Sequence, residues 1–313
     1  MDSFKFFAGS SHPQLAKDVA DNLGVDLGKM HTDTFSSGEL YVKVEETIRG
    51  QDVYVLQTAA DGEVNNNYME LFLMLDTFKR ASAASVNVIM PHFGYARQDK
   101  KSEPREPISA RLMADLLQVV GFDRIITVDL HADQIQGFFG KPVDHLTAMP
   151  LFVDYFSKKN LQNAVVVAPD TGRAKFAKKM SDKIGADLAI MHKTRPDHNV
   201  AEVVNIVGDV KNKTVILVDD MVDTGGSITS GLDTLRLFDC KEDIYLACTH
   251  PIFSGPCVER LKKAGLKEVV VTDTVPIPSF KRFEGLQVLS AAPLIGEVIK
   301  RNVEHRSISS LFD

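Results

Sequence analysis

The sequence predicts an α/β protein with two tandem domains of one kind, each a mostly parallel sheet flanked by helices. Short β-branched runs alternate along the chain with helix-period patterns, as in βαβ units. Similar segments recur in the same order in the two halves of the chain. The polar clusters follow predicted strands, where parallel sheets bind their ligands.

An internal repeat indicates the domain organisation. LAKDVADNLGVDL at Leu15–Leu27 aligns with FAKKMSDKIGADL at Phe176–Leu188, which we expect to be helical. The later pairs are Val53–Leu56 with Val215–Val218, Val86–His92 with Ile244–His250, and Ile125–Asp129 with Val269–Asp273. Coincidence between common amphipathic helices would not keep this order. We therefore expect domains at residues 1–147 and 148–313.

Composition narrows the class of protein. With 313 residues, 44% hydrophobic and 25% charged, the chain has the composition of a soluble globular protein. A net charge of −6 argues against non-specific nucleic-acid binding. We expect no membrane span and no signal peptide, because long apolar runs are missing. The three cysteines have no metal-ligand spacing, so we expect reduced thiols and a cytoplasmic location.

The stretch TVILVDDMVDTGGSIT predicts an anion site beside paired carboxylates. Thr214–Val218 forms a buried strand, and Asp219 and Asp220 follow at its end. The loop Asp223–Ser227 then leads into a helix, whose N-terminus favours an anion. Gly225 and Gly226 permit positive φ and close backbone approach, while Thr224 and Ser227 add hydroxyl donors.

The two acids beside this loop suit sugar hydroxyls or a metal ion, so the stretch predicts a sugar-phosphate site. A Walker loop is excluded because the GxxxxGK[ST] pattern is missing here. The alternative is an ordinary strand–turn–helix with surface carboxylates.

Two further polar clusters lie in the first half of the chain. The strand at Asn87–Met90 leads into PHFGYARQD at Pro91–Asp99, where aromatic and basic residues could bind a base and phosphates. The strand Arg124–Val128 leads into Asp129-Leu-His131, and His131 could bind a metal or a phosphate. A solvated basic loop and a satisfied polar histidine are the respective alternatives.

Two more clusters lie in the second half. The strand Ala164–Ala168 ends in PDTGR at Pro169–Arg173, which could hold a Mg²⁺-bound pyrophosphate or simply cap a helix. We interpret Met191–Asn199 as a mobile loop rather than a strand or helix. Its Lys193 and Arg195 could neutralise charge on a reacting phosphate, unless this is only a charged surface loop.

Taken together, these segments resemble the ribose-phosphate pyrophosphokinase (PRPP synthetase) family over nearly the whole chain. The resemblance rests on FSSGE, GYARQD, DLHADQIQGFF, APDTG, KTRPDHNVAEVVNIVG, VDDMVDTGGSIT and CTHPIFSGP. It implies two type I phosphoribosyltransferase-like domains and transfer of the diphosphoryl group of ATP to the C1 hydroxyl of ribose 5-phosphate, giving PRPP and AMP for nucleotide biosynthesis. It also implies Mg²⁺ as cofactor and a homo-oligomer, commonly a hexamer.

The resemblance also implies a role for each matching residue. Lys193 and Arg195 would be catalytic, and Phe35, Ser37, Gly38, Glu39, Arg97, Gln98 and Asp99 would bind ATP. Ribose 5-phosphate would be bound by Arg195, Asp219, Asp220, Asp223, Thr224, Gly225, Gly226 and Ser227. Asp170, Thr171, Gly172 and Arg173 would form the pyrophosphate loop, and His131 and Asp170 would contact the metal.

The chain departs from the family pattern at three places. Ser37 stands where Asp or Asn is frequent, and Arg173 follows Gly172 in a shortened pyrophosphate loop. Between Lys101 and Arg105 the chain reads Ser-Glu-Pro, where many members carry a basic residue and a regulatory serine. Two other functions compete with PRPP synthesis. A phosphoribosyltransferase would consume PRPP, but usually has one such domain; a non-catalytic regulatory partner would usually lose the loop residues that this chain keeps.

Overall fold

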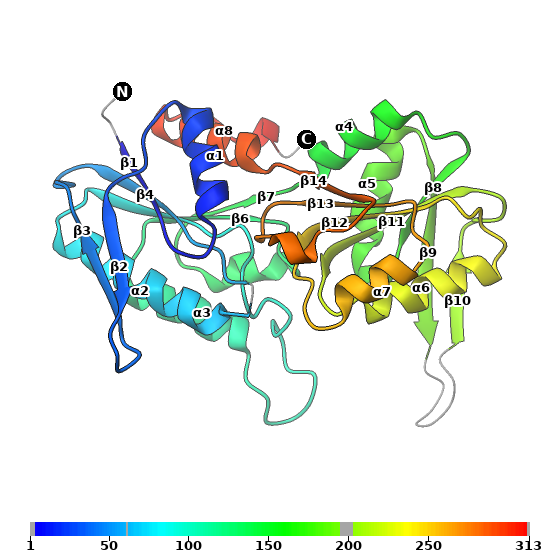
Figure 1. The fold of residues 1–313 in the computed structure, drawn as a ribbon, viewed down its shortest axis with the longest axis horizontal. Coiled ribbons are helices and arrows are strands. Elements are labelled where there is room, and N and C mark those ends of the chain that lie inside the picture. The colour runs from blue at the N-terminus through cyan, green and yellow to red at the C-terminus, as the bar shows by residue number, and fades with distance from the viewer. Residues whose placement is uncertain (1–3, 61, 195–202, 312–313) are drawn as a thin grey trace. The chain divides into compact units, whose positions relative to one another are not determined.

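The computed structural model describes residues 4–60, 62–194 and 203–311, and its contacts divide the chain into two compact units (Figure 1). The first unit holds the chain up to Thr147, together with Thr274–Pro276 and the segment from Ser290 onward. The second unit holds Ala148–Asp273 and Ile277–Leu289.

The first unit is built on a parallel five-stranded sheet of order β1-β4-β5-β6-β7. Its strands are β1 (Phe4–Ala8), β4 (Asp52–Leu56), β5 (Ser85–Ile89), β6 (Arg124–Val128) and β7 (Val143–Leu146). Its helices are α1 (Pro13–Leu23), α2 (Val64–Arg80), α3 (Ser109–Val120), the 3₁₀ turn η1 (Asp133–Phe138), α8 (Ala292–Val303) and the 3₁₀ turn η4 (Ser309–Leu311). An antiparallel hairpin of β2 (Met30–Thr34) and β3 (Leu40–Val44) lies outside the sheet.

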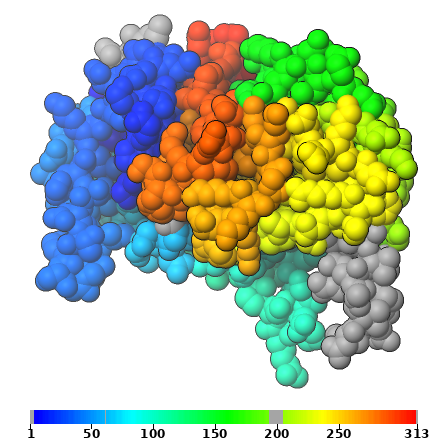
Figure 2. All heavy atoms as spheres, turned by 45° about the vertical axis from the view of Figure 1, so that its right-hand side comes forward, coloured from blue at the N-terminus to red at the C-terminus, as the bar shows by residue number. Residues whose placement is uncertain are grey.

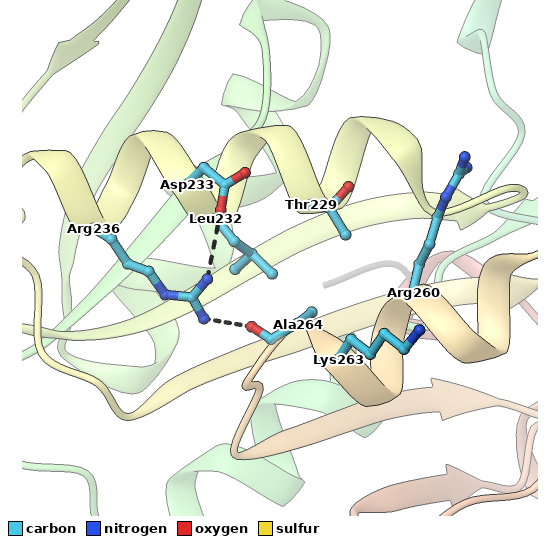
Figure 3. A pocket seen from close by; sticks show the side chains of 7 residues that line it. All are labelled: Thr229, Leu232, Asp233, Arg236, Arg260, Lys263 and Ala264. Carbon is cyan, nitrogen blue, oxygen red and sulfur yellow. Dashed lines mark hydrogen bonds and ion pairs between the residues drawn. The ribbon is translucent and has the colours of Figure 1, made fainter.

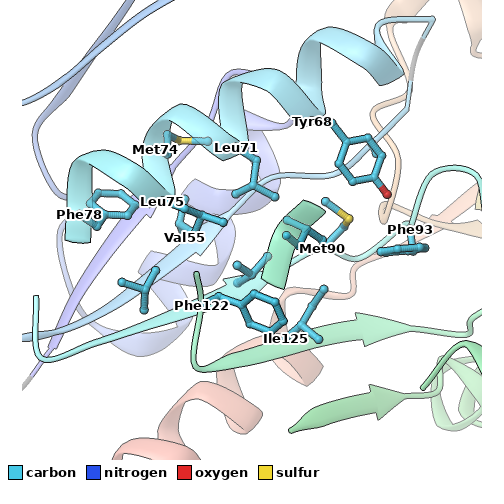
Figure 4. Packing of buried hydrophobic residues seen from close by; sticks show 14 of the residues in the cluster. Val55, Tyr68, Leu71, Met74, Leu75, Phe78, Met90, Phe93, Phe122 and Ile125 are labelled. Carbon is cyan, nitrogen blue, oxygen red and sulfur yellow. The ribbon is translucent and has the colours of Figure 1, made fainter. Parts of the chain in front are cut away.

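The core of the first unit lies between α2 and one face of this sheet (Figure 4). Leu71, Met74, Leu75 and Phe78 of α2 are fully buried and follow the helical repeat. They pack with Val55 and other strand residues whose β-branched side chains fit a buried parallel sheet. This packing fixes the strand ends from which the functional loops leave.

The second unit is built on a seven-stranded sheet of order β10-β9-β8-β11-β12-β13-β14. Its strands are β8 (Ala164–Ala168), β9 (Asp187–Thr194), β10 (Val203–Val207), β11 (Thr214–Val222), β12 (Ile244–Pro251), β13 (Glu268–Thr272) and β14 (Leu286–Leu289). Its helices are α4 (Met149–Lys159), α5 (Ala174–Ile184), α6 (Gly226–Leu237), α7 (Cys257–Lys263) and the 3₁₀ turns η2 (Thr171–Arg173) and η3 (Ser279–Lys281). Only the β9–β10 pair among these strands is antiparallel.

The two sheets confirm the predicted fold class and the repeat. The order β8-β11-β12-β13-β14 reproduces β1-β4-β5-β6-β7, with α1 and α5 in equivalent places after the first strand. The next segment of each copy is an antiparallel pair, β2–β3 in the first and β9–β10 in the second. In the second copy this pair joins the sheet beside β8.

The C-terminal segment belongs to the first unit, whereas the sequence repeat placed residues 148–313 together. Helix α8 packs against α1 and buries Ile295, Val298 and Ile299. Its Gly296 lies so close to α1 that an added Cβ would fall 2.3 Å from the Asn22 side-chain oxygen. Glycine leaves room for the Asn22 side chain at this contact.

The sequence interpretation was wrong about two element boundaries. Strand β11 continues through Asp219 and Asp220 to Val222, because β12 pairs with it as far as Pro251. Residues 191–194 belong to β9 and pair with β10, so they are not part of a loop. The paired backbone satisfies their hydrogen bonds despite polar side chains. Residues 195–199 of the predicted loop lie outside the described residues.

No helix in the described part of the chain combines the length and apolar character needed to cross a bilayer.

Candidate functional site

The paired acids lie at the carboxyl end of β11, where the Asp220 N–H donates to Asp219 Oδ1 at 2.9 Å. Asp220 is buried, and Asp219 is half-buried. The Arg173 guanidinium lies 3.0 Å from Asp220 Oδ2, and its Nε lies 4.0 Å from Asp219 Oδ1. The structure therefore brings one cation of the pyrophosphate loop against both acids.

Burial raises the pKa of Asp219 well above its usual value, and the negative charge of Asp220 raises it further. Arg173 opposes this rise in pKa. A carboxylate in this setting is poorly solvated and gains from further hydrogen-bond donors. Hydroxyl groups of a bound sugar would supply such donors, which suits the proposed role of this acid.

The loop Asp223–Ser227 forms the expected turn into a helix. Gly225 has φ +76° and ψ 0°, a left-handed conformation that favours glycine, and it caps α6. A Cβ added there would lie 3.3 Å from the buried Cys257 sulfur, so space also favours glycine. Thr229 Oγ1 donates to the carbonyls of Gly225 and Gly226 at 3.2 and 3.0 Å. Because the first N–H groups of a helix have no intrahelical acceptor, this end can bind an anion.

The pyrophosphate loop lies at the end of the neighbouring strand, β8. Asp170 Oδ1 accepts from the N–H groups of Gly172 and Arg173, at 2.8 and 3.2 Å. Its Oδ2 makes no hydrogen bond with the residues that the structure describes. A carboxylate oxygen placed this way fits the oxygen ligands that Mg²⁺ prefers. Thr171 and Gly172 are exposed beside it.

Of the two proposed catalytic residues, Lys193 and Arg195, the structure describes only the backbone of Lys193. Lys193 lies in β9, where its backbone pairs with Val204 of β10, and its side chain lies outside the described residues. Arg195 lies wholly outside them.

Four of the predicted ATP-binding residues, Phe35, Ser37, Gly38 and Glu39, lie at the tip of the β2–β3 hairpin. Phe35 is 55% exposed, and its ring centroid lies 5.7 Å from that of Tyr41. Ser37 Oγ donates to Glu39 Oε2 at 2.8 Å, and Gly38 turns the chain with φ +91°. An aromatic ring exposed at such a tip is available to a planar ligand.

The other predicted ATP-binding residues precede α3 in the first unit. Arg97 and Gln98 are exposed. Asp99 Oδ2 accepts from Gln134 Nε2 at 2.5 Å, which joins the RQD segment to the segment after His131. His145 Nε2 accepts from the N–H of Leu130 at 2.8 Å and so holds the residue before His131. The structure therefore brings these two predicted clusters together.

The first copy lacks the acid pair of the second. In the repeat, Gln57 and Thr58 stand where the second copy has Asp219 and Asp220. Both side chains are fully buried and engaged: Gln57 Nε2 donates to Glu70 Oε2 at 2.7 Å, and Thr58 Oγ1 donates to the Thr274 carbonyl at 3.1 Å. Among the described residues, the paired acids at this position of the repeat therefore occur only in the second unit.

A preassembled metal cage is not found in the described ranges, where no three His, Cys, Asp or Glu side chains gather as metal ligands. His131 and Asp170 lie in different units. Asp170 could supply one carboxylate ligand, with the remaining positions left to phosphate oxygens and water, as is usual for Mg²⁺ bound with a nucleotide.

Sequence reasoning missed Ser254 and Arg260, which contact the Asp223–Ser227 loop. Ser254 belongs to the CTHPIFSGP segment, which supports the family resemblance but does not by itself predict a contact with the loop. Arg260 lies in α7 and is exposed. An exposed arginine on a helix gives no signal in a single sequence.

A parallel sheet with a strand–loop–helix anion site beside paired acids defines the class of proteins with phosphoribosyl transferase domains. A model of the phosphoribosyl transferase domain matches residues 147–284. A second model, the N-terminal domain of ribose phosphate pyrophosphokinase, matches residues 4–121. The chain belongs to the ribose-phosphate pyrophosphokinase family.

Relatives of full length agree with this assignment. The ribose-phosphate pyrophosphokinases of Oceanobacillus iheyensis and Bacillus subtilis (strain 168) are each 48% identical over 99% of this chain, covering 98% and 97% of the relative. The crystal structure of phosphoribosylpyrophosphate synthetase from Mycobacterium smegmatis superposes with a TM-score of 0.91 at 45% identity, covering 97% of this chain and 99% of that one.

Proposed function

We propose that the loop and acids at the end of β11 bind ribose 5-phosphate, and that the ATP-binding groups come from the first unit. The reaction is that of the family: the diphosphoryl group of ATP passes to the C1 hydroxyl of ribose 5-phosphate, giving PRPP and AMP for nucleotide biosynthesis. The observation that carries the proposed sugar site is the left-handed, glycine-capped turn at Asp223–Ser227, directly after the two acids.

The sugar site positions the nucleophile. In our proposal the 5-phosphate accepts hydrogen bonds from the N–H groups at the start of α6 and from the hydroxyl groups of Thr224 and Ser227. Asp219 accepts from ribose hydroxyls, while Asp220 is held by Arg173. This arrangement fixes the C1 hydroxyl for in-line attack on the β-phosphorus, which is the main requirement of phosphoryl transfer.

Charge neutralisation is the second requirement. Lys193 and Arg195 would bring positive charge to the phosphates as the bond to the α-phosphate oxygen breaks. Bound Mg²⁺ would neutralise and orient phosphate oxygens. Asp170, through Oδ2, and His131 are the residues that would contact it. Arg97, Gln98, Asp99 and the hairpin residues Phe35, Ser37, Gly38 and Glu39 would hold the nucleotide.

We also propose that the chain works as a homo-oligomer, with a hexamer as the expected form, in the cytoplasm. Helix α3 exposes Leu112, Leu116 and Val119, at 51%, 37% and 81%, on neighbouring turns, and such an apolar stripe favours a contact between copies. The three cysteines are free thiols, which is consistent with a reducing compartment. Light scattering coupled to chromatography measures the assembly directly.

Product analysis tests the proposed function. We expect AMP to form from ATP only when ribose 5-phosphate and Mg²⁺ are both present, and EDTA to stop the reaction until excess Mg²⁺ is restored. A phosphoribosyltransferase would instead consume PRPP and release pyrophosphate in the presence of a nucleobase. A non-catalytic partner would give neither product. Failure to release AMP with all three components present would overturn the proposal.

A further inference from the structure

The segment Phe253–Arg260 hydrogen-bonds three successive carbonyl groups at the proposed phosphate loop. The bonds run from Phe253 N–H to the Val222 carbonyl at 3.0 Å, from Ser254 N–H to the Asp223 carbonyl at 3.0 Å, and from Arg260 Nη1 to the Thr224 carbonyl at 2.9 Å. Two of these donors are backbone groups. The third is a charged side chain, whose hydrogen bonds are stronger than neutral ones.

These bonds determine which way the N–H groups of the loop point. A trans peptide unit is planar, and its C=O and N–H point in opposite directions. The described residues contain no cis peptide bond. Because the carbonyls of Val222, Asp223 and Thr224 face the segment Phe253–Arg260, the N–H groups of Asp223, Thr224 and Gly225 point away from it. The turn thus presents successive donors on one side, as anion-binding turns do.

Side chains of the same segment contact the loop closely. Ser254 Oγ donates to Asp223 Oδ1. The Cys257 sulfur would lie 3.3 Å from a Cβ at Gly225, and Arg260 Nη1 would lie 3.6 Å from a Cβ at Gly226. The segment Phe253–Arg260 therefore holds the loop Asp223–Ser227 by both hydrogen bonds and packing.

We infer that Arg260 is a positioning residue for ribose 5-phosphate: by holding the Thr224 carbonyl, it aims the Gly225 N–H at the 5-phosphate. Ser254 holds Asp223 twice: its N–H donates to the Asp223 carbonyl, and its hydroxyl donates to the Asp223 carboxylate. This inference rests on the proposed function, because it needs the phosphate to occupy the loop. Arg260 itself lies on the far side of the loop peptide and acts through it.

The neighbourhood of Arg260 supplies a matched control. Arg260 and Lys263 of α7 line a surface cavity of about 230 Å³ shared with α6 (Figure 3). In the space-filling view, the yellow α6 and the yellow-orange α7 lie side by side on the same face (Figure 2). Lys263 forms no hydrogen bond or ion pair with any residue that the structure describes. It therefore tests the effect of a nearby positive charge without the bond to the loop.

The experiment compares steady-state kinetics of the full-length variants Arg260→Met, Arg260→Lys and Lys263→Met. Methionine keeps the apolar stem but removes the donor, whereas lysine keeps a cation that can donate to the carbonyl. We expect Arg260→Met to raise the KM for ribose 5-phosphate about fivefold, the effect of one net hydrogen bond. The KM for ATP should not change. Arg260→Lys should recover most of the loss, and Lys263→Met should behave as wild type.

Two results would overturn the inference: an unchanged KM for ribose 5-phosphate in Arg260→Met, or an equal rise in Lys263→Met, which would indicate a long-range charge effect. Ser254→Ala keeps the backbone bond to the Asp223 carbonyl and removes only the hydroxyl bond to the Asp223 carboxylate, so a selective rise in the KM for ribose 5-phosphate is expected from the loss of that side-chain contact. Ser227→Ala separates this inference from the proposed function. If Ser227→Ala raises the KM for ribose 5-phosphate and Arg260→Met does not, only the positioning role fails. If neither does, the proposed sugar site is wrong.

Discussion

The Arg173 guanidinium lies 3.0 Å from Asp220 Oδ2 and so connects the loop after β8 to the acids of β11. Arg173 is fixed at its other end, where its N–H donates to Asp170 Oδ1 at 3.2 Å. One residue therefore links the proposed metal-contacting carboxylate to the proposed sugar-binding acids. Arg173, which departs from the family pattern, therefore has a structural role: its guanidinium places a positive charge beside two adjacent carboxylates.

Replacing Arg173 by methionine should weaken ribose 5-phosphate binding. Without the cation, the pKa of Asp219 rises further, and a larger fraction of Asp219 is protonated and unable to accept from sugar hydroxyls. We expect a rise of about tenfold in the KM for ribose 5-phosphate near neutral pH, comparable to loss of a charge-assisted hydrogen bond. Lys175→Met, on exposed α5, is the control. Equal KM values for both variants would argue against this role.

Ribose 5-phosphate affinity should depend on the ionisation of Asp219. Its pKa is raised by burial and by Asp220, so protonation begins at a higher pH than for an ordinary aspartate. Binding should therefore weaken as pH falls through this raised pKa. Calorimetric titration of ribose 5-phosphate over a pH series measures the midpoint. In Asp219→Asn, this weakening of binding at lower pH should disappear. If it persists, the titration belongs to another group.

The same ionisation should reduce the stability of the folded protein. In the unfolded chain Asp219 ionises near its ordinary pKa, whereas the folded state retains the proton to higher pH. Its contribution to folding is therefore present at low pH and is lost as pH rises through the raised pKa. The Asp219→Asn variant has no carboxylate at this position and so does not lose stability in this way as pH rises. Above that pH the variant should have a higher free energy of unfolding than wild type.

Urea unfolding of both proteins across pH checks this sign. The difference in free energy of unfolding should shrink as pH is lowered toward the ordinary pKa of an aspartate. A variant that is less stable than wild type at every pH would show that Asp219 is held by favourable contacts rather than placed for binding. Such a result would also contradict the interpretation of the acid pair as a poorly solvated binding site.

Lys193→Ala should reduce turnover much more than binding. A cation that meets charge developing on the phosphates contributes mainly in the transition state, so we expect kcat to fall on the order of 10²–10³-fold with small changes in both KM values. Lys179→Ala, on the exposed face of α5, should leave kcat unchanged. Near-normal turnover of Lys193→Ala, with both substrates still bound, would remove Lys193 from the mechanism.

Much of the fold could be predicted because apolar strands carry a strong local signal. β6 at Arg124–Val128 and β8 at Ala164–Ala168 match the predicted bounds, since both are short β-branched runs buried in a parallel sheet. The end of β11 could not be predicted. Asp219 and Asp220 are unusual inside a strand, and they are accommodated by pairing with β12 and by Arg173.

Long-range packing was also invisible in the sequence. The amphipathic pattern of α8 shows that it covers an apolar surface, but not which unit provides that surface. That surface is provided by α1 of the first unit, which is far from α8 in the chain. For the same reason the motif residues of the loop could be named from the sequence, whereas Arg260, which holds one of their carbonyls, could not.

Electron density from crystals soaked with ribose 5-phosphate tests the central claim most directly. The account predicts the 5-phosphate at the Asp223–Ser227 turn, within hydrogen-bond distance of N–H groups at the start of α6, and ribose hydroxyls against Asp219. A turn that stays empty while the sugar binds at another place in the protein would contradict it.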